Sequence, residues 1–259
     1  MKEMSLYVHT LQSHILNKEM NISVYVPDDY LHITLPVLYF LHGRTGNEEL
    51  LCQLGMDRTA DSLIKTGKMA PLIIVCPNMD NSRGLNSADN YEEFDGKYGI
   101  VHKGRYEDYF IDEVIPFIDS IFSTVNGAYG RFVGGVSAGG YAALNIGLRH
   151  QDLFSRIGGH MPAIDLSYED EDECYFRDRG MWLENDPVSI AEMVEFSDIS
   201  VYLDDGKDDE GKFYISCEKL YCILKSKGVK VENHVFEGHH NGEYLLSNME
   251  NYLGFYGSV

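Results

Sequence analysis

Ser137 stands between two glycines in the motif Gly135-x-Ser137-x-Gly139. Where such a motif joins a buried strand to a helix, it forms a nucleophile elbow, in which small neighbours allow close packing and the serine hydroxyl is exposed. A serine held in this way can attack a carbonyl carbon and form a covalent acyl-enzyme. The chain contains 25 glycines, so the motif alone is also compatible with a flexible glycine-rich loop.

Acidic and basic partners for this serine are present further along the chain. Residues 204–209 contain four aspartates, and residues 237–240 end in His239 and His240. A serine of this kind needs an imidazole to take its proton and a carboxylate to orient that imidazole, and the elbow fold places them in the order Ser, Asp or Glu, His. An acidic loop alone is often a solvated turn, and paired histidines are often incidental or form a metal patch. Three ordered groups, each at the end of a predicted strand, favour a catalytic triad.

A negatively charged tetrahedral intermediate requires two backbone N–H donors. The residue after the serine, Ala138, is expected to supply one donor at the start of a helix. The second usually comes from the loop after an earlier strand, and the sequence His42-Gly43-Arg44 follows the apolar run at residues 37–41. An ordinary glycine-containing turn is the alternative interpretation of that loop.

The elements that would position these groups alternate along the chain. Apolar runs bounded by turn residues predict strands over residues 22–26, 36–41, 72–76, 131–136, 156–160, 200–203 and 233–236. Helical spacing is found over residues 50–65, 106–122, 138–149, 212–227 and 242–253, with Pro116 expected to kink or restart its helix. An antiparallel pair is expected over residues 6–26. The alternation predicts an α/β fold with a mostly parallel sheet and helices on both faces.

The composition of the chain limits the classes of partner that it is expected to bind. We expect residues 1–259 to form a single domain, because no linker or repeat interrupts them. The net charge of −20, from 41 acidic and 21 basic residues, opposes binding to nucleic acid or anionic membranes. No apolar run is long enough to span a bilayer, and the N-terminal residues 1–6 lack the apolar core of a signal peptide, so a cytoplasmic location is expected. Homo-oligomer formation stays open.

The five cysteines show no spacing typical of disulfide frameworks or zinc sites, so we expect reduced thiols. The mechanism outlined above needs neither a metal nor an organic cofactor, and we predict none. The expected partner is a small-molecule ester.

With these features the chain resembles the putative-esterase family of α/β-hydrolases, which includes S-formylglutathione hydrolases, feruloyl and acetylxylan esterases, tributyrin esterases and mycolyl transferases. The resemblance covers nearly the whole chain and rests on residues 24–27, 35–43 and 106–118, the elbow, Gly206-x-x-Asp209 and Gly238-x-His240. It implies an α/β-hydrolase fold in which Ser137 is the nucleophile, Asp209 the acid and His240 the base. It also implies that Arg44 and Ala138 donate the oxyanion N–H groups. Asp208 and His239 are the close alternatives, since a shift of one residue would exchange them.

Two features depart from this family. Relatives commonly have a tryptophan near the catalytic histidine, whereas Trp182 is the only tryptophan in this chain. Arg44 is a large cation where a small or apolar residue is expected, and its side chain would meet an anionic substrate group or an acid of the protein. Met161 and Trp182 are candidates for an apolar wall around the acyl group, with a plain core position as the alternative.

Segments 78–103 and 165–186 follow predicted strand ends and are expected to shape access to the site, with surface decoration as the alternative. Together these features predict a serine carboxylic-ester hydrolase for small acyl esters, thioesters or acylated sugars. An acyl transferase with the same triad, or a non-catalytic binding protein on the same fold, are the alternatives.

Overall fold

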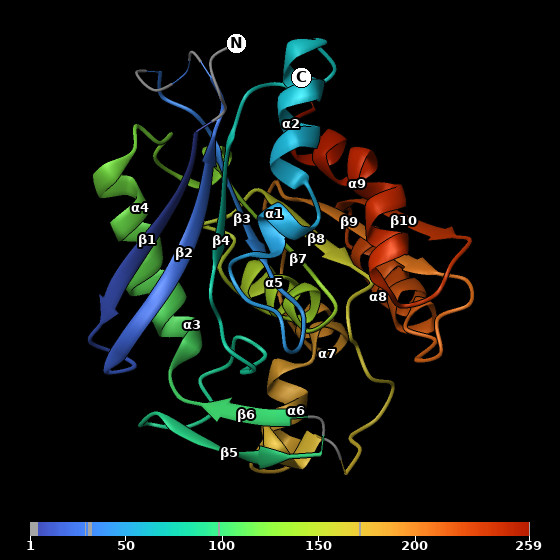
Figure 1. Cartoon of the computed structure of the whole chain (residues 1–259). Coiled ribbons are helices and arrows are strands. Elements are labelled where there is room, and N and C mark those ends of the chain that lie inside the picture. Colours follow the sequence, from blue (N-terminus) through green and yellow to red (C-terminus); the bar gives the residue numbers. More distant parts are fainter. Residues whose placement is uncertain (1–4, 29, 31–32, 98, 171, 259) are drawn as a thin grey trace.

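An eight-stranded sheet runs through the centre of the molecule (Figure 1). The structure is a computed structural model and describes residues 5–28, 30, 33–97, 99–170 and 172–258. The strand order is β1-β2-β4-β3-β7-β8-β9-β10; the first two strand pairs are antiparallel and all later pairs are parallel. The mostly parallel sheet is therefore confirmed. The strands are β1 (Ser5–Ser13), β2 (Lys18–Val26), β3 (Val37–Leu41), β4 (Ile73–Pro77), β7 (Arg131–Val136), β8 (Arg156–His160), β9 (Ser200–Gly206) and β10 (Lys230–Phe236).

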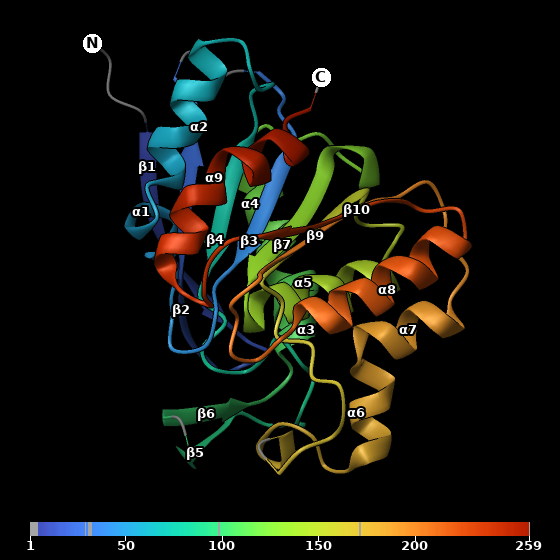
Figure 2. The same ribbon diagram turned by 90° about the vertical axis from the view of Figure 1, so that its right-hand side faces the viewer.

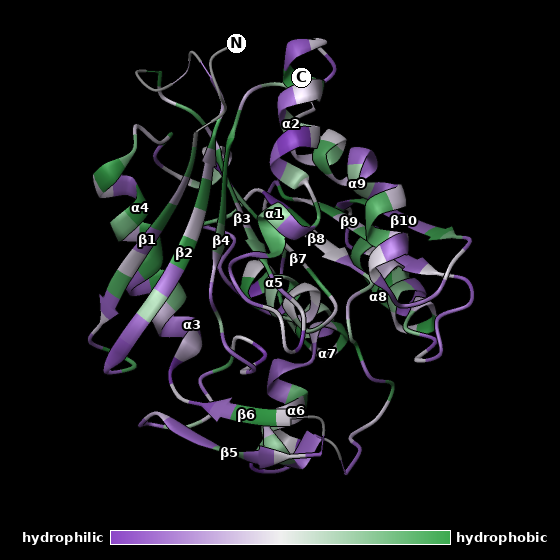
Figure 3. Cartoon of the chain, viewed as in Figure 1, coloured by the Kyte–Doolittle hydropathy of each residue, from purple (hydrophilic) through white to green (hydrophobic). Residues whose placement is uncertain are grey.

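The central strands are apolar because both of their faces are covered. Every residue of β3, β4 and β7 is buried. Successive side chains of a strand point to opposite faces, so Tyr39 enters one hydrophobic core and its neighbours Leu38 and Phe40 enter the other. Figure 3 shows this apolar centre in green and more hydrophilic segments around it.

Helices cover both faces of the sheet (Figure 2). One core contains side chains of α1 (Leu50–Gln53), α2 (Met56–Lys65) and α9 (Gly242–Tyr256). The other contains side chains of α4 (Ile115–Ile121), α5 (Ala138–Arg149), α7 (Pro187–Met193) and α8 (Tyr214–Ser226). The predicted bounds of β7, β8 and α5 match the structure.

Other bounds differ from the prediction for physical reasons. The helix expected over residues 50–65 is divided at Gly55, whose φ of +59° ends the first helix. The segment 106–122 consists of α3 (Tyr106–Asp108), a π-helical turn (Tyr109–Val114) and α4, so the helix restarts at Ile115, next to Pro116. Strand β10 begins at Lys230, earlier than expected. It lies at the edge of the sheet, where the exposed residues Lys230 and Glu232 interrupt the apolar run.

Two excursions extend from the same end of the sheet in Figure 1. The first forms the hairpin β5 (Glu92–Gly96) and β6 (Gly99–Lys103). The second contains a 3₁₀ turn (Asp172–Cys174) and α6 (Arg179–Asn185). Both excursions supply residues to the cavity described below.

None of the five cysteines, all of which lie within the described residues, forms a disulfide. Among the described residues, no helix is both long enough and apolar enough to cross a bilayer. Residues 1–4, on which the expectation about a signal peptide partly depends, lie outside the described part of the chain.

Candidate active site

Ser137 occupies a strained junction between β7 and α5. Its φ of 54° and ψ of −119° are unusual for a residue with a side chain, and such strain is typical of functional turns. The flanking glycines make the turn possible. A Cβ on Gly135 would lie 2.5 Å from the carbonyl oxygen of Gly139, and a Cβ on Gly139 would overlap the carbonyl oxygen of Leu41. Both glycines are therefore required by close backbone packing against β3, which excludes the flexible-loop interpretation.

The backbone of Ser137 is fixed on both sides. Its N–H donates to the carbonyl of His160 at the end of β8 (3.0 Å). Its carbonyl accepts from the N–H groups of Tyr141 (2.9 Å) and Ala163 (3.0 Å). These bonds tie the serine to the neighbouring strand end and to the first turn of α5, and its hydroxyl faces a cavity.

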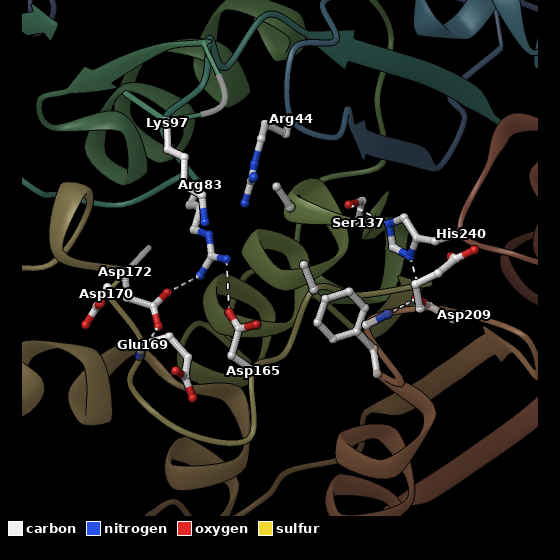
Figure 4. Close-up of a pocket in the computed structure, with 15 residues that line it drawn as sticks. Arg44, Arg83, Lys97, Ser137, Asp165, Glu169, Asp170, Asp172, Asp209 and His240 are labelled. Atoms are coloured by element: carbon white, nitrogen blue, oxygen red, sulfur yellow. Dashed lines mark hydrogen bonds and ion pairs between the residues drawn. The ribbon is translucent and has the colours of Figure 1, made fainter. Parts of the chain in front are cut away.

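A chain of hydrogen bonds joins Ser137, His240 and Asp209 (Figure 4). Ser137 Oγ lies 2.8 Å from His240 Nε2, and His240 Nδ1 lies 2.8 Å from Asp209 Oδ2. The other Asp209 oxygen accepts the N–H of Gly211 (2.7 Å). Because an ionised carboxylate can only accept, Nδ1 carries the proton and Nε2 of a neutral ring is left to accept from the serine hydroxyl.

Asp209 is buried, with 3 % of its surface exposed. Burial alone would raise the pKa of Asp209, but the hydrogen bond with His240, the nearby carboxyl group of Asp205 and the charge of His240 hold that pKa below its ordinary value. The carboxylate therefore stays ionised at neutral pH and can stabilise a protonated imidazole.

Close backbone contacts between the loops after β9 and β10 determine which aspartate lies beside His240. A Cβ on Gly206 would overlap the carbonyl oxygen of Gly238, and the same carbonyl accepts the N–H of Asp208 (3.0 Å). With the loops in this register, Asp209 points inward to His240 while Asp208 is exposed.

The second histidine of the pair faces away from the serine. His239 is exposed and its Nδ1 lies 2.9 Å from the exposed carboxylate of Glu210. The structure thus brings Ser137, Asp209 and His240 together and leaves Asp208 and His239 outside the chain of hydrogen bonds.

Arg44 and Ala138 line the same cavity as the serine. Ala138 is the first residue of α5, and the N–H groups of a first helical turn have no acceptor within their helix. Arg44 is a central residue of a turn closed by the Gly46 N–H and the Gly43 carbonyl (3.0 Å). A Cβ on Gly43 would lie 3.2 Å from the Cβ of Ser137, so this turn passes directly beside the serine.

His42 fixes the start of that turn. Its Nε2 accepts the N–H of Met79 (2.9 Å), and its Nδ1 lies 2.9 Å from the carbonyl oxygen of Gly43. Burial lowers the pKa of His42, so the ring is neutral and Nδ1 donates to Gly43.

The cavity in front of the serine has a volume of about 670 Å³ and a largely charged lining. The Arg83 guanidinium is 5 % exposed and forms ion pairs with Asp165 (3.1 Å) and Asp172 (3.2 Å), while it also lies over the ring of Tyr141. Figure 4 shows Arg44 and Lys97 on the same side of the cavity. Its lining residues are Arg44, Arg83, Lys97, Ser137, Ala138, Ala163, Asp165, Glu169, Asp170, Asp172, Asp209, Glu210, Gly211, Phe213 and His240.

The structure does not place Met161 or Trp182 in this lining. Met161 is 2 % exposed and packs in the core that contains α2 and α9. Trp182 is 5 % exposed, belongs to the opposite core and lies near the ring of Tyr168. The core alternative therefore describes Met161. Trp182 packs in the opposite core and also lines a separate, smaller cavity.

Sequence reasoning missed three residues at this site. Phe213 presents its ring at 67° to the His240 ring, with centroids 5.5 Å apart. Arg83 lies in the long segment after β4, where no motif marks it. Asp205 is a buried acid near the end of β9. The one signal for Asp205 is its position two residues after the apolar run 200–203.

Asp205, Asp209 and His240 each offer an oxygen or nitrogen atom, and these atoms lie within 4.8 Å of one another. Both ring nitrogens of His240 are already engaged, one with Asp209 and the other with Ser137. The arrangement therefore fits proton transfer along the chain of hydrogen bonds better than metal coordination.

Comparisons with known proteins agree with this architecture. A ferulic acid esterase is 24 % identical over 98 % of both chains, with a TM-score of 0.81. The fluorophosphonate-binding serine hydrolase F of Staphylococcus aureus is 18 % identical over 100 % of both chains (TM-score 0.80). An S-formylglutathione hydrolase from Agrobacterium tumefaciens is 20 % identical over 98 % of this chain and 95 % of that chain (TM-score 0.78).

These likenesses confirm the α/β-hydrolase fold. Residues 13–255 match the family model described as putative esterase. The chain belongs to the putative-esterase family.

Proposed function

We propose that the chain is a serine carboxylic-ester hydrolase in which Ser137 is the nucleophile, His240 the general base and Asp209 the orienting acid. The observation that carries this proposal is the unbroken chain of two 2.8 Å hydrogen bonds from Ser137 Oγ to Asp209. It begins at a strained serine that opens directly into a cavity.

The proposed reaction has two halves. As Ser137 Oγ attacks the ester carbonyl, its proton passes to His240 Nε2, and the N–H groups of Arg44 and Ala138 stabilise the oxyanion. Collapse of the tetrahedral intermediate breaks the ester bond, and His240 returns the proton to the leaving alcohol or thiol. Water then attacks the acyl-enzyme, His240 takes the water proton, and collapse returns a proton to Ser137 as the acid leaves. Asp209 stabilises the imidazolium in both halves.

The cavity lining supports a small acyl group and a hydrophilic leaving group. Ala138, Ala163 and Phe213 are the apolar residues among those that line it, whereas most of the others are charged or polar. A short acyl chain can be covered by this small apolar area, and a sugar, polyol or polar thiol can meet the charged wall. Similar structures are named for ferulic acid esters and for S-formylglutathione, and both compounds belong in the substrate panel.

The turnover test uses p-nitrophenyl acetate, followed by a panel of acyl chain lengths, acetylated and feruloylated sugars and S-formylglutathione. We expect hydrolysis by the natural chain and none above background by Ser137→Ala. His240→Ala should lose several orders of magnitude in kcat, whereas the matched control His239→Ala should stay within about twofold. Folded protein without ester turnover would overturn the proposal in favour of a binding protein.

Product analysis separates hydrolysis from acyl transfer, since both pass through the same acyl-enzyme. With an added alcohol acceptor, a hydrolase should still release mainly the free acid. Predominant formation of the new ester would assign an acyl transferase instead. We also propose that residues 1–259 form one domain, because a single eight-stranded sheet carries both hydrophobic cores and helices pack on each of its faces.

A further inference from the structure

A second carboxyl group lies behind Asp209. Asp205 is the penultimate residue of β9 and is 0 % exposed. Its Oδ1 accepts the N–H of Gly206 (2.8 Å). Its Oδ2 is buried and has no hydrogen-bond donor among the described residues. One carboxylate oxygen of Asp205 lies within 4.8 Å of ligand atoms of both Asp209 and His240.

The titratable and hydrogen-bonding groups that face Asp205 come from the loops after β9 and β10 and from the helices α8 and α9. Asp209 and His240 approach from the loops after β9 and β10. The buried thiol of Cys217 and the backbone N–H of Tyr214 face it from α8, and Tyr244 faces it from α9. Ionising both of these close, buried carboxyl groups carries a large cost in electrostatic free energy. Asp209 is the one of the two that is paired with His240.

We propose that Asp205 is a positioning residue that keeps its proton and donates it, from Oδ2, in a hydrogen bond to the Asp209 carboxylate. This inference rests on the proposed function. It gives the orphaned Oδ2 a role and gives Asp209 a third donor, after Gly211 and His240. With three donors around it, the Asp209 carboxylate is held in the orientation that meets His240 Nδ1.

A pH dependence follows from this arrangement. Burial, followed by the hydrogen bond to Asp209 and the charge of Asp209, raises the pKa of Asp205 to about 8. Below that pH the group is a neutral donor. Above it, Asp205 is ionised, loses its donor and repels Asp209, so the orientation of His240 is lost. The natural protein should therefore show an alkaline fall in kcat/KM with a midpoint near pH 8.

The test compares pH profiles of kcat and KM for p-nitrophenyl acetate, corrected for the uncatalysed reaction. The natural protein should retain about one tenth of its plateau value one pH unit above the midpoint. Asp205→Asn keeps a donor amide that does not titrate, so its profile should stay flat through pH 9. Asp205→Ala has no donor, and kcat should fall by about 10- to 100-fold at every pH, without a midpoint near 8.

Asp208→Asn is the matched control. It removes a carboxylate from the same loop, but Asp208 is exposed, so the alkaline fall should remain. Thermal unfolding is recorded for every variant, and Asp205→Asn, which preserves side-chain volume, carries the decision. An alkaline fall that persists unchanged in Asp205→Asn, or natural activity in Asp205→Ala at all pH values, would overturn the proposal.

A second readout is independent of turnover. The Nδ1–H resonance of His240, assigned by its loss in His240→Gln, should show an inflection near pH 8 in the natural protein and none in Asp205→Asn. If the protein hydrolyses no ester, the proposed function fails while this inflection still decides the role of Asp205. Ester hydrolysis without the inflection would overturn the role of Asp205 alone.

Discussion

Asp204 is the centre of a buried hydrogen-bond network behind the candidate site. Its carboxylate accepts from the hydroxyls of Tyr244 (2.7 Å) and Tyr252 (2.9 Å) and lies 3.1 Å from Nδ1 of His160. Asp204 and His160 are both fully buried. The network joins β8, β9 and α9, and the backbone carbonyl of His160 also holds the Ser137 N–H.

Replacing Asp204 with alanine should destabilise the protein by about 3–5 kcal/mol. The substitution leaves three buried donors without their acceptor, and an unsatisfied buried polar group costs about 1–3 kcal/mol. Three such donors, in the lower half of that range, together cost about 3–5 kcal/mol. Because domains are stable by about 5–15 kcal/mol, this loss is a large fraction of the total.

Urea unfolding at pH 7, followed by circular dichroism, measures the effect. Tyr252→Phe removes one donor and should cost about 1 kcal/mol. The control Asp198→Ala removes an exposed carboxylate, 3.2 Å from the exposed Lys230, and should be indistinguishable from the natural protein. A loss below about 1 kcal/mol for Asp204→Ala, with an unchanged m-value, would refute this account of the network.

Three further predictions concern the elbow, the loop register and the second carboxyl group. Gly139→Ala should lower the free energy of unfolding by about 3 kcal/mol, because the added Cβ would overlap backbone atoms. Gly254→Ala in α9 places its Cβ in open space and should raise the free energy of unfolding by about 0.5–1 kcal/mol. Equal urea midpoints for the two variants would contradict this prediction. Asp209→Asn should lower kcat by about 10³- to 10⁴-fold and Asp208→Asn by less than about twofold, and the reverse order in steady-state kinetics would show a different register. The folded-state pKa of Asp205 is raised from 3.8 to about 8, so the folded protein holds a proton that the unfolded chain releases. Stability should therefore fall as pH rises from about 4 to about 8, by up to about 1.4 kcal/mol per pH unit, and Asp205→Asn should remove that slope in urea titrations; identical slopes would contradict it.

The sequence predicts the bounds of those elements whose structure depends on residues adjacent in the chain. The bounds of β7 and α5 are predicted because a continuous apolar run meets a glycine motif at Ser137. The edge strand β10 is predicted only in part, because half-buried strands carry charged residues that interrupt the apolar run. The order of Ser137, Asp209 and His240 along the chain follows the family motif. Their contact depends on the Gly206 and Gly238 backbones, whose approach is visible only in three dimensions.

The remaining residues of the site depend on contacts between distant segments. Arg83 lies at the cavity because a segment far along the chain packs next to it, where Asp165 and Asp172 form ion pairs with its guanidinium. Apolar character indicates that Met161 and Trp182 are buried, but it does not tell whether an apolar residue is enclosed in a core or lines a cavity. Asp205 lies in a run of acids, and only its burial distinguishes it from its exposed neighbour Asp208.

Labelling by a fluorophosphonate tests the central claim most directly, since the reagent reacts with a serine that a neighbouring base has activated. Intact-mass measurement followed by peptide mapping should show one adduct on the natural protein, located at Ser137, and no adduct on Ser137→Ala or His240→Ala. Folded natural protein that remains unlabelled, or an adduct that persists in Ser137→Ala, would contradict the account.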